Sequence, residues 1–194
     1  MRLFAAAVLD LPRGLAAALA SSALSDFGSA ARPVAPEAMH LTLAFLGEVP
    51  GARVEAAAGC LEVLSGFGPF EAVAGEAGFF PSPDSPRVFW LGFGSGAEKL
   101  AEAAGRLSAA LRVEGFALEE RAFHPHLTLA RLKGRVGPEA VRSNAFFKYF
   151  SIFRRFAPGP AALIDAERAA VKRPTSPGAE PSFADGKLFA DSSV

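Results

Sequence analysis

The sequence predicts an α+β fold in which most strands pair antiparallel. Short apolar segments and Ala/Leu-rich helical segments follow one another as strand, helix, strand, helix, two strands, helix and strand, with a hairpin at the end. Hydrophobic residues make up 51% of the 194 residues, which is enough for a sizeable core. The tetrapeptide His-Leu-Thr-Leu occurs twice, starting at His40 and at His126. We therefore expect one domain over residues 1–194, built from two similar lobes around a central cleft.

The first segments alternate between strand and helix. Residues 2–9 form a short apolar run that ends at the turn sequence DLPRG, which is typical of a buried strand. A secretory signal is the alternative for this run, but Asp10, Pro12 and Arg13 interrupt it and favour a strand followed by a turn. The next expected elements are a helix over 15–24, a loop over 28–36, a strand over 39–46 ended by Gly47 and Pro50, and a helix over 54–64.

The middle of the chain predicts two strands and a long helix. The strands lie near 69–79 and 87–93, and the three prolines of FFPSPDSPR between them require a loop. The clearest helix covers 95–115, with Ser95 as its expected cap and Gly115 as its expected end. The apolar stripe of this helix consists of Leu100, Ala104, Leu107 and Leu111.

The last part of the chain begins with a strand over 126–132, which carries the second tetrapeptide. A short helical stretch is expected from Pro138. Residues 162–173 then predict a strand, and residues 182–190 predict its hairpin partner.

Charge and cysteine content exclude several classes of protein. The 20 Lys and Arg residues balance 20 Asp and Glu residues, which argues against a protein that coats long nucleic acids by charge. A small site for one phosphate is still allowed. The single cysteine, Cys60, excludes an internal disulfide and a Cys-only zinc site, and its apolar neighbours indicate a core position. No apolar run approaches the roughly 18–20 residues of a membrane span, and we expect a cytoplasmic monomer.

The two tetrapeptides place the same residue types on the same face of two strands, because alternate residues of a strand face the same way. In the first motif this rule separates two sets: His40, Thr42 and Ala44 on one face, and Leu41, Leu43 and Phe45 on the other. In the second motif the corresponding sets are His126, Thr128 and Ala130, and Leu127 and Leu129. The leucines are expected in the core, while each histidine and threonine point together into a cleft.

Two imidazoles and two hydroxyls at one cleft are suited to in-line displacement at phosphorus. An imidazole with a pKa of about 6.5 is an acid or a base near neutral pH, so one histidine can activate the incoming oxygen while the other protonates the leaving oxygen. Threonine hydroxyls can donate to the oxygens that gain negative charge. Arg131 is either a clamp for a phosphate or a solvated residue at the strand end. This chemistry requires no metal and no cofactor.

Other interpretations of the same residues stay open. A single histidine on a strand is more often a structural, hydrogen-bonded residue. His124 shares its parity with His126, so the two could bind zinc with His40 as a third ligand. Phe45 and Trp90 could stack on a base, but the parity of Phe45 and the apolar run RVFWLGF around Trp90 favour core positions for both.

At these residues the sequence resembles the 2H phosphoesterase superfamily, which is named for two His-x-Thr/Ser motifs. Within it, the chain is most similar to the RNA 2′,3′-cyclic phosphodiesterases, also called 2′-5′ RNA ligases. The resemblance covers roughly residues 1–135. It rests on the stretches MRLFAAAVLDLP, HLTLAFLGEV, FFPSPDSPRVFWLG and HPHLTLARLK.

This resemblance implies a bilobal fold with two antiparallel sheets lining a central cleft and helices outside. It also implies metal-independent hydrolysis of an RNA or nucleoside 2′,3′-cyclic phosphate to a 2′-phosphomonoester. By analogy, His126 is the proton acceptor that activates water and His40 is the proton donor. Thr42, Thr128 and Arg131 would bind the phosphate. The implied partners are RNA ends or nucleotides that carry a 2′,3′-cyclic phosphate.

Three further hypotheses use the same residues. The C-terminal stretch VKRPTSPGAEPSF differs from the pattern usual in the family, which motivates a non-catalytic module that binds a nucleotide or an RNA end. A reversible 2′-5′ RNA ligase would use the same two histidines, so the sequence does not separate it from a hydrolase. A zinc hydrolase would be recognised by its metal content.

Overall fold

The computed structural model describes residues 1–9, 14, 17–19, 21, 27–67, 70–133, 158–165 and 171–172. Within these residues the strands form one eight-stranded sheet in which neighbours pair antiparallel. The expected α+β class is therefore confirmed. The strands are β1 (Arg2–Leu9), β2 (Ala31–Pro33), β3 (His40–Glu48), β4 (Ala74–Phe80), β5 (Val88–Phe93), β6 (His126–Leu132), β7 (Pro158–Asp165) and β8 (Val171–Lys172). The helices are α2 (Val54–Gly59) and α3 (Ala97–Val113), with 3₁₀ turns η1 (Gly28–Ala30), η2 (Pro36–Ala38), η3 (Gly51–Arg53) and η4 (Cys60–Leu64).

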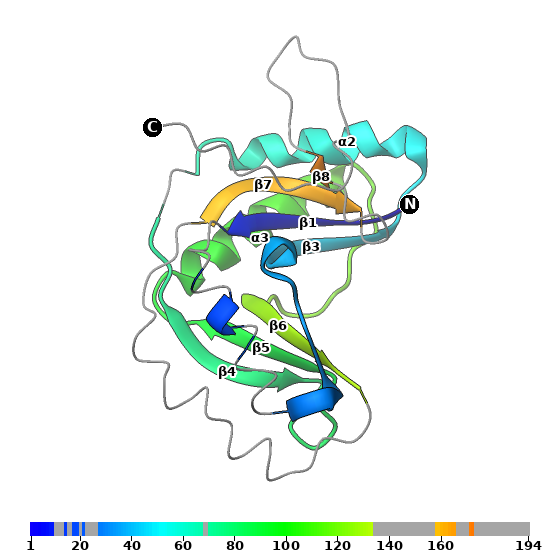
Figure 1. Cartoon of the computed structure of the whole chain (residues 1–194). Helices are drawn as coiled ribbons and strands as arrows, with labels where there is room; N and C mark the ends of the chain where they lie inside the picture. Colours follow the sequence, from blue (N-terminus) through cyan, green and yellow to red (C-terminus); the bar gives the residue numbers. More distant parts are fainter. Residues whose placement is uncertain are drawn as a thin grey trace.

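The strand order divides the sheet into two halves (Figure 1). One half consists of β4, β5 and β6, and the other of β3, β1, β7 and β8, while the short β2 pairs with the end of β6. A single register pair, Leu41 with Leu127, joins β3 to β6 in the middle. The expectation of two separate sheets is therefore wrong for the described residues, because this pair makes the sheet continuous.

The first core cluster joins β1 and β3 to α2, η4 and α3. Its largest buried residues include Leu3, Leu41, Leu46, Val54, Leu61, Leu100, Leu107 and Leu111. The predicted stripe of α3 lies in this cluster, and Leu107 and Leu111 are fully buried. Burying one such leucine stabilises the fold by about 1.5–3 kcal/mol relative to leaving it exposed. Cys60 is buried in the same cluster, as expected.

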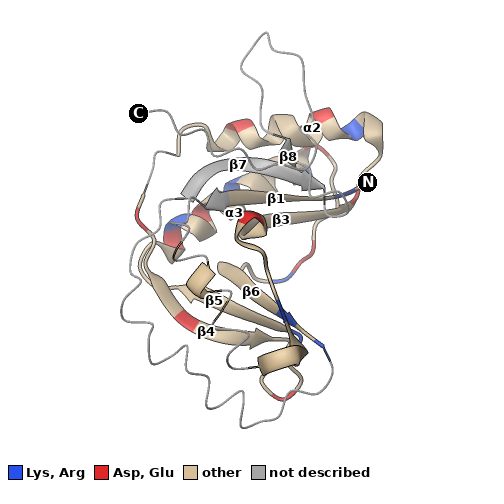
Figure 2. Ribbon diagram, in the orientation of Figure 1, with Lys and Arg blue, Asp and Glu red and all other residues tan. Residues whose placement is uncertain are grey.

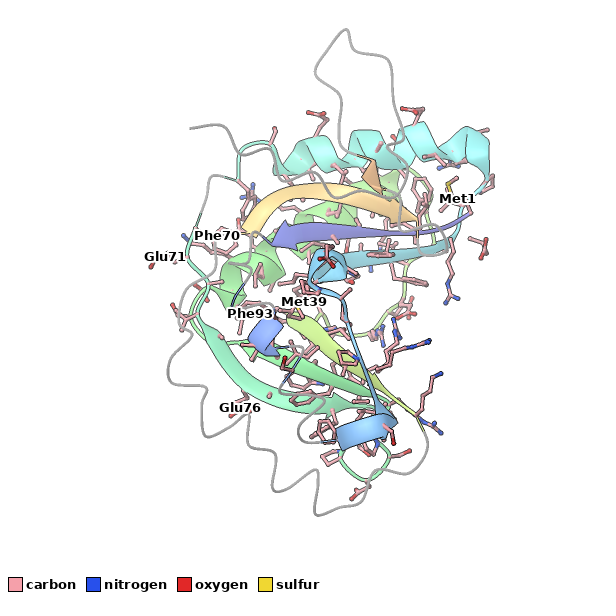
Figure 3. All side chains as sticks on the ribbon, in the orientation of Figure 1. Met1, Met39, Phe70, Glu71, Glu76 and Phe93 are labelled. Atoms are coloured by element: carbon pink, nitrogen blue, oxygen red, sulfur yellow. The ribbon has the colours of Figure 1, made fainter. Side chains whose placement is uncertain are left out.

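The second core cluster covers one face of the β4–β5–β6 half. It combines strand residues with residues from the segment before β3: Phe79, Phe89, Leu91, Leu127 and Leu129 with Leu19, Phe27 and Met39. Phe93 packs against both clusters and lies between the two halves of the sheet in Figure 3. One face of each half of the sheet therefore packs into a core, and the opposite face is available for another role.

The ends of α3 are fixed by two glycines with positive φ. Gly96 (φ 85°) is the residue before the helix, and a Cβ there would lie 2.5 Å from the Glu71 carbonyl oxygen. The prediction that Ser95 caps the helix is therefore wrong, because the chain enters α3 through the glycine and no side chain makes a cap hydrogen bond. Gly115 (φ 78°) ends the helix as predicted, and the amide of Phe116 donates to the Leu111 carbonyl beside it.

Two other expected segments differ from the structure. Residues 28–36 are not only a loop, because η1 and β2 lie within them and β2 pairs with β6. Residues 162–173 are not one strand, because β7 ends at Asp165 and β8 pairs back onto it. Most of the expected helix over 15–24, the helical stretch from Pro138 and the strand over 182–190 lie outside the described residues. Among the helices of the described ranges, none has the length and apolar character needed to cross a membrane.

Candidate active site

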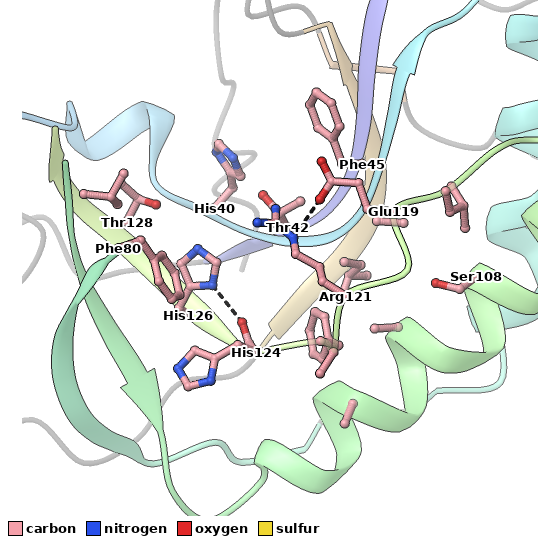
Figure 4. Close-up of a pocket in the computed structure, with 18 of the residues that line it drawn as sticks. His40, Thr42, Phe45, Phe80, Ser108, Glu119, Arg121, His124, His126 and Thr128 are labelled. Atoms are coloured by element: carbon pink, nitrogen blue, oxygen red, sulfur yellow. Dashed lines mark hydrogen bonds and ion pairs between the residues drawn. The ribbon is translucent and has the colours of Figure 1, made fainter. Parts of the chain in front are cut away.

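A pocket of about 800 Å³ draws its lining from both halves of the sheet, from α3 and from the segment 118–124 before β6. All of the predicted site residues line it: His40, Thr42, His126, Thr128 and Arg131. Figure 4 shows His40, His126 and Thr128 on one side of this pocket, Ser108 and Glu119 on the other, and Thr42 between them. The structure therefore brings together the two motifs that are far apart in the sequence.

Each motif contains a β-bulge at the same position. In each motif one residue has no partner in the neighbouring strand. In β3, Ala44 pairs with Ala5 of β1 and Thr42 pairs with Ala6. In β6, Ala130 pairs with Phe89 of β5 and Thr128 pairs with Trp90. Leu43 and Leu129 are therefore the extra residues. In β6, the carbonyl of Leu129 accepts a hydrogen bond from the Val34 amide at 2.8 Å. A bulge shifts the alternation of side chains by one residue, so strict parity no longer applies beyond it.

The bulges decide which residues share the face of the histidines. Phe45 and Arg131 stand at equivalent positions beyond the two bulges, and both line the pocket. Ala44 and Ala130 are buried in the two cores, and Ala44 also lines the pocket. The prediction that Ala130 shares the histidine face is therefore wrong, because it assumed unbroken alternation along the strand. Phe45 is half-buried: it packs against Phe4 and Ala6, as a core position requires, but it also lines the pocket.

Both imidazole rings are oriented by the same backbone contact. Nδ1 of His40 lies 2.7 Å from the Ala38 carbonyl oxygen, and Nδ1 of His126 lies 2.7 Å from the His124 carbonyl oxygen. A carbonyl can only accept, so Nδ1 carries the hydrogen in each ring. Nε2 is then the basic atom of each neutral ring, and it is the atom through which each histidine can take or give a proton.

Burial lowers the pKa of both catalytic candidates below the ordinary 6.5 of histidine. Loss of solvation is the largest cause in each ring, and the hydrogen bond to the carbonyl opposes it. Positive charge on Arg131 and His126 lowers the pKa of His40 further, and charge on His124 and Arg121 does so for His126. At neutral pH both rings of the unliganded protein are therefore mainly neutral.

Aromatic side chains hold the two imidazoles in different ways. The Phe4 ring of β1 lies beside His40 with a centroid distance of 4.7 Å, and the Phe80 ring meets His126 edge-on at 4.9 Å. Trp90 stacks on Phe80 at 5.1 Å. Trp90 is half-buried on the same face as Thr128 and belongs to none of the core clusters, so the prediction of a core position is wrong for this residue.

Several pocket residues were not predicted from the sequence. Phe80 is the last residue of β4, and Arg121 and Glu119 lie in the irregular segment before β6. Nε of Arg121 lies 2.7 Å from Oε2 of Glu119. Figure 2 shows basic residues at the C-terminal end of β6, on the same strand as the second motif. The only available signal was the cluster EERAFHPH, whose charged residues precede the second motif directly.

His124 does not complete a metal site. Its ring lies edge-on to Trp90 at 4.7 Å, and its centroid is 6.3 Å from that of His126. In the part of the chain that the structure describes, no group of three or more His, Cys, Asp or Glu side chains could hold a metal ion. The zinc hypothesis therefore has no ligand set among these residues.

Comparisons with known proteins identify relatives in sequence and in fold. The chain is 39% identical over 111 residues to the RNA 2′,3′-cyclic phosphodiesterase of Aeropyrum pernix, and the match covers 57% of this chain and 62% of the relative. The fold is similar to that of a protein from Thermus thermophilus, with a TM-score of 0.62, 25% identity and 96% of each chain covered. E. coli LigT in complex with 3′-AMP gives a TM-score of 0.53 at 26% identity, covering 96% of this chain and 95% of that one.

The chain thus spans less than two thirds of the length of the curated relative from Aeropyrum pernix. The model of the family described as LigT like Phosphoesterase matches residues 10–90 and 94–176. These ranges include both tetrapeptides and cover most of the chain. The protein therefore belongs to the LigT-like phosphoesterase family.

Proposed function

We propose that the protein hydrolyses the 2′,3′-cyclic phosphate of an RNA end or a nucleoside to a 2′-phosphomonoester, without a metal. The observation that carries this proposal is the doubled motif, whose histidines and threonines line one pocket. The activity named for the Aeropyrum pernix relative and the nucleotide bound to E. coli LigT support this type of substrate.

The reaction needs one neutral and one protonated imidazole. Neutral His126 takes a proton from water at Nε2 while the water oxygen bonds to phosphorus. The bond between phosphorus and the 3′ oxygen breaks, and protonated His40 gives its Nε2 proton to that oxygen. The products are a 2′-phosphate and a 3′-hydroxyl, and the two protons balance.

Electrostatics favour this arrangement once substrate is bound. The hydroxyls of Thr42 and Thr128 donate to the non-bridging oxygens, and Arg131 offsets their negative charge. The bound phosphate also raises the pKa of the nearby imidazoles, since an opposite charge favours the protonated form. Binding of the anion therefore favours the protonated form of His40, which takes its proton from solvent.

The direct test uses purified protein, a nucleoside 2′,3′-cyclic phosphate and excess EDTA. We expect turnover, with the product identified as the 2′-phosphomonoester by phosphorus NMR. The double variant His40→Ala/His126→Ala should be inactive while it keeps the unfolding temperature of the parent protein. No turnover by the parent protein, or full turnover by the double variant, would refute the proposal. Tight nucleotide binding in calorimetry without turnover would instead support a binding module.

Other parts of the same hypothesis stay predictions. They are the division of residues 1–194 into two pseudo-symmetric lobes of one domain, the monomeric state and the cytoplasmic location. A reversible ligase activity also stays a prediction, and gel assays with paired RNA fragments would detect it.

A further inference from the structure

We propose that the pocket contains a second anion subsite, which binds the phosphate on the 5′ oxygen of the terminal nucleotide of an RNA strand. Arg121 is its main contact. The inference rests on the proposed function and adds a substrate class to it: a strand end or a 5′-phosphorylated nucleotide is preferred to a nucleoside cyclic phosphate.

The pocket is larger than the reacting groups require. Its volume of about 800 Å³ lies in the upper part of the range of roughly 300–1,000 Å³ that is usual for ligand pockets. The two motifs line only one side of it. The remaining lining comes from α3 and the segment 118–124, including Ser108, Arg112, Glu119, Arg121 and Phe123. We call this part the helix arm of the pocket.

Arg121 is suited to hold an anion in the helix arm. Its Nε lies 2.7 Å from Oε2 of Glu119, and the Arg121 side chain is 80% exposed. This ion pair uses Nε, so the terminal Nη1 and Nη2 atoms can contact a ligand. These two atoms present the forked donor pair that recognises phosphate oxygens. Figure 4 shows Arg121 directed from its segment toward Thr42, between Glu119 and the catalytic candidates.

The charge in the helix arm is positive. Arg112 and Arg121 outweigh Glu119, so an anion is favoured there. Arg131 of β6 and Arg121 of the segment 118–124 both line the pocket. The proposal assigns one anion position to each of these two arginines.

The chemistry of an RNA end matches this arrangement. The cyclic phosphate occupies the 2′ and 3′ oxygens of the last ribose, and the next phosphate of the strand is attached to the 5′ oxygen of the same ribose. One sugar therefore separates the two anions. A ligand that places its cyclic phosphate between the histidines would direct its second phosphate away from them, toward a neighbouring part of the same pocket.

The experiment compares three substrates that differ only beyond the 5′ oxygen: adenosine 2′,3′-cyclic phosphate, its 5′-phosphorylated form, and the dinucleotide ApA with a terminal cyclic phosphate. The quantity measured is the ratio of kcat/KM for each phosphorylated substrate to that for the nucleoside. We expect this ratio to exceed 1 in the parent protein and to fall by about 2–5-fold in Arg121→Gln, as for the loss of a charge pair at an exposed site. Arg121→Lys should restore part of the ratio, because it keeps the charge.

Arg106→Gln is the matched control. Arg106 of α3 also pairs with a glutamate, with 2.6 Å between Nη2 and Oε1 of Glu102, but it does not line the pocket. The ratio should therefore not change in this variant. Any effect of Arg121 on the pKa of His126 acts on all three substrates and cancels in the ratio.

The outcomes separate this inference from the proposed function. An unchanged ratio in Arg121→Gln, or an equal fall in Arg106→Gln, would overturn the subsite while turnover of the nucleoside still supports the function. A ratio of 1 in the parent protein would overturn it as well. Absence of turnover on all three substrates would refute the proposed function itself.

Discussion

The two halves of the pocket carry the same candidate reacting groups in different surroundings. In β3 and in β6, a histidine, a threonine and a bulged leucine follow one another at the same spacing. Each imidazole donates through Nδ1 to the carbonyl two residues earlier. Beyond the bulge, however, β3 presents Phe45 and β6 presents Arg131. The comparison teaches that the candidate proton-transfer groups are duplicated, whereas the residues available for ligand recognition differ between the halves.

The neighbouring strands extend this difference. Thr42 pairs with the small Ala6 of β1, while Thr128 pairs with the large Trp90 of β5. Phe45 packs with Phe4 and Ala6 in a small apolar cluster. The β3 half therefore surrounds the imidazole of His40 with apolar side chains. The β6 half combines aromatic side chains with the cation of Arg131.

Loss of either imidazole is the strongest test of the duplicated chemistry. We expect His40→Ala and His126→Ala each to lower kcat/KM by about 10²–10⁴-fold, because each removes one proton transfer. His124→Ala should lower kcat/KM less, since the backbone carbonyl that orients His126 remains. The measurement is kcat/KM on a nucleoside 2′,3′-cyclic phosphate across pH. If one of the two rings proves dispensable, the halves are not chemically equivalent.

Substitution of the two threonines tests the same equivalence, with a smaller expected effect on the rate. Thr42→Val and Thr128→Val keep the shape of the side chain but remove the hydroxyl, and each should lower kcat by about 10²-fold, as for loss of one transition-state donor. Thr42→Ser and Thr128→Ser should keep most of the rate because they keep the donor. Unequal losses in the two valine variants would show that one half holds the developing charge.

The predicted site residues line one pocket, but the sequence did not predict the other residues that surround them. Alternation along a strand was sufficient for His40 and Thr42, because both precede the bulge. It failed for Ala130, because a bulge depends on the register with the neighbouring strand, and that register is a tertiary property. Arg121 was missed because an irregular segment has no periodicity from which a direction can be inferred. The local signals of α3 were reliable, since its apolar stripe and Gly115 act within one element.

The divided recognition predicts unequal effects at the two equivalent positions beyond the bulges. Arg131→Leu should lower kcat/KM by about 10–10²-fold, since a charge-assisted hydrogen bond contributes about 1.5–3 kcal/mol. Phe45→Leu should lower kcat/KM less, because leucine keeps the apolar contact with Phe4 and Ala6. Inhibition by inorganic phosphate should weaken in the arginine variant only. Equal losses of kcat/KM in both variants would contradict the proposed division.

A glycine substitution tests the aromatic side chains of the β6 half. A Cβ on Gly78 would lie 2.3 Å from the Trp90 ring, so Gly78→Ala must displace that ring. We expect the free energy of unfolding to fall by about 1–3 kcal/mol, as for overpacking. Gly59→Ala is the control, because nothing lies within 4 Å of a Cβ there. Thermal unfolding of both variants is compared with that of the parent protein, and an unchanged unfolding temperature of Gly78→Ala would mean that Trp90 moves without cost.

The pH profile is the mildest test. The acid limb of kcat/KM reports protonation of the base, and the alkaline limb reports loss of the proton from the acid. Burial lowers the pKa of both rings, so both limbs and the maximum between them should lie below pH 6.5. The profile of kcat should lie at higher pH, because bound phosphate raises both pKa values. A maximum of kcat/KM well above pH 7 would contradict the burial of the two rings.

In both rings Nδ1 is held by a backbone carbonyl, so each proton transfer of the proposed reaction takes place at Nε2 and must be reversed between turnovers. In the proposed reaction, His126 ends each cycle with the proton and His40 ends it without one. Both rings must then exchange protons with solvent or buffer before the next water can be activated. The form of the enzyme with His126 protonated and His40 neutral is suited to the reverse reaction, in which His40 takes the 3′-hydroxyl proton and the cyclic phosphate forms again. Buffer concentration should therefore influence kcat. The product should also inhibit the forward reaction, because it binds the enzyme form in which His126 is protonated and His40 is neutral.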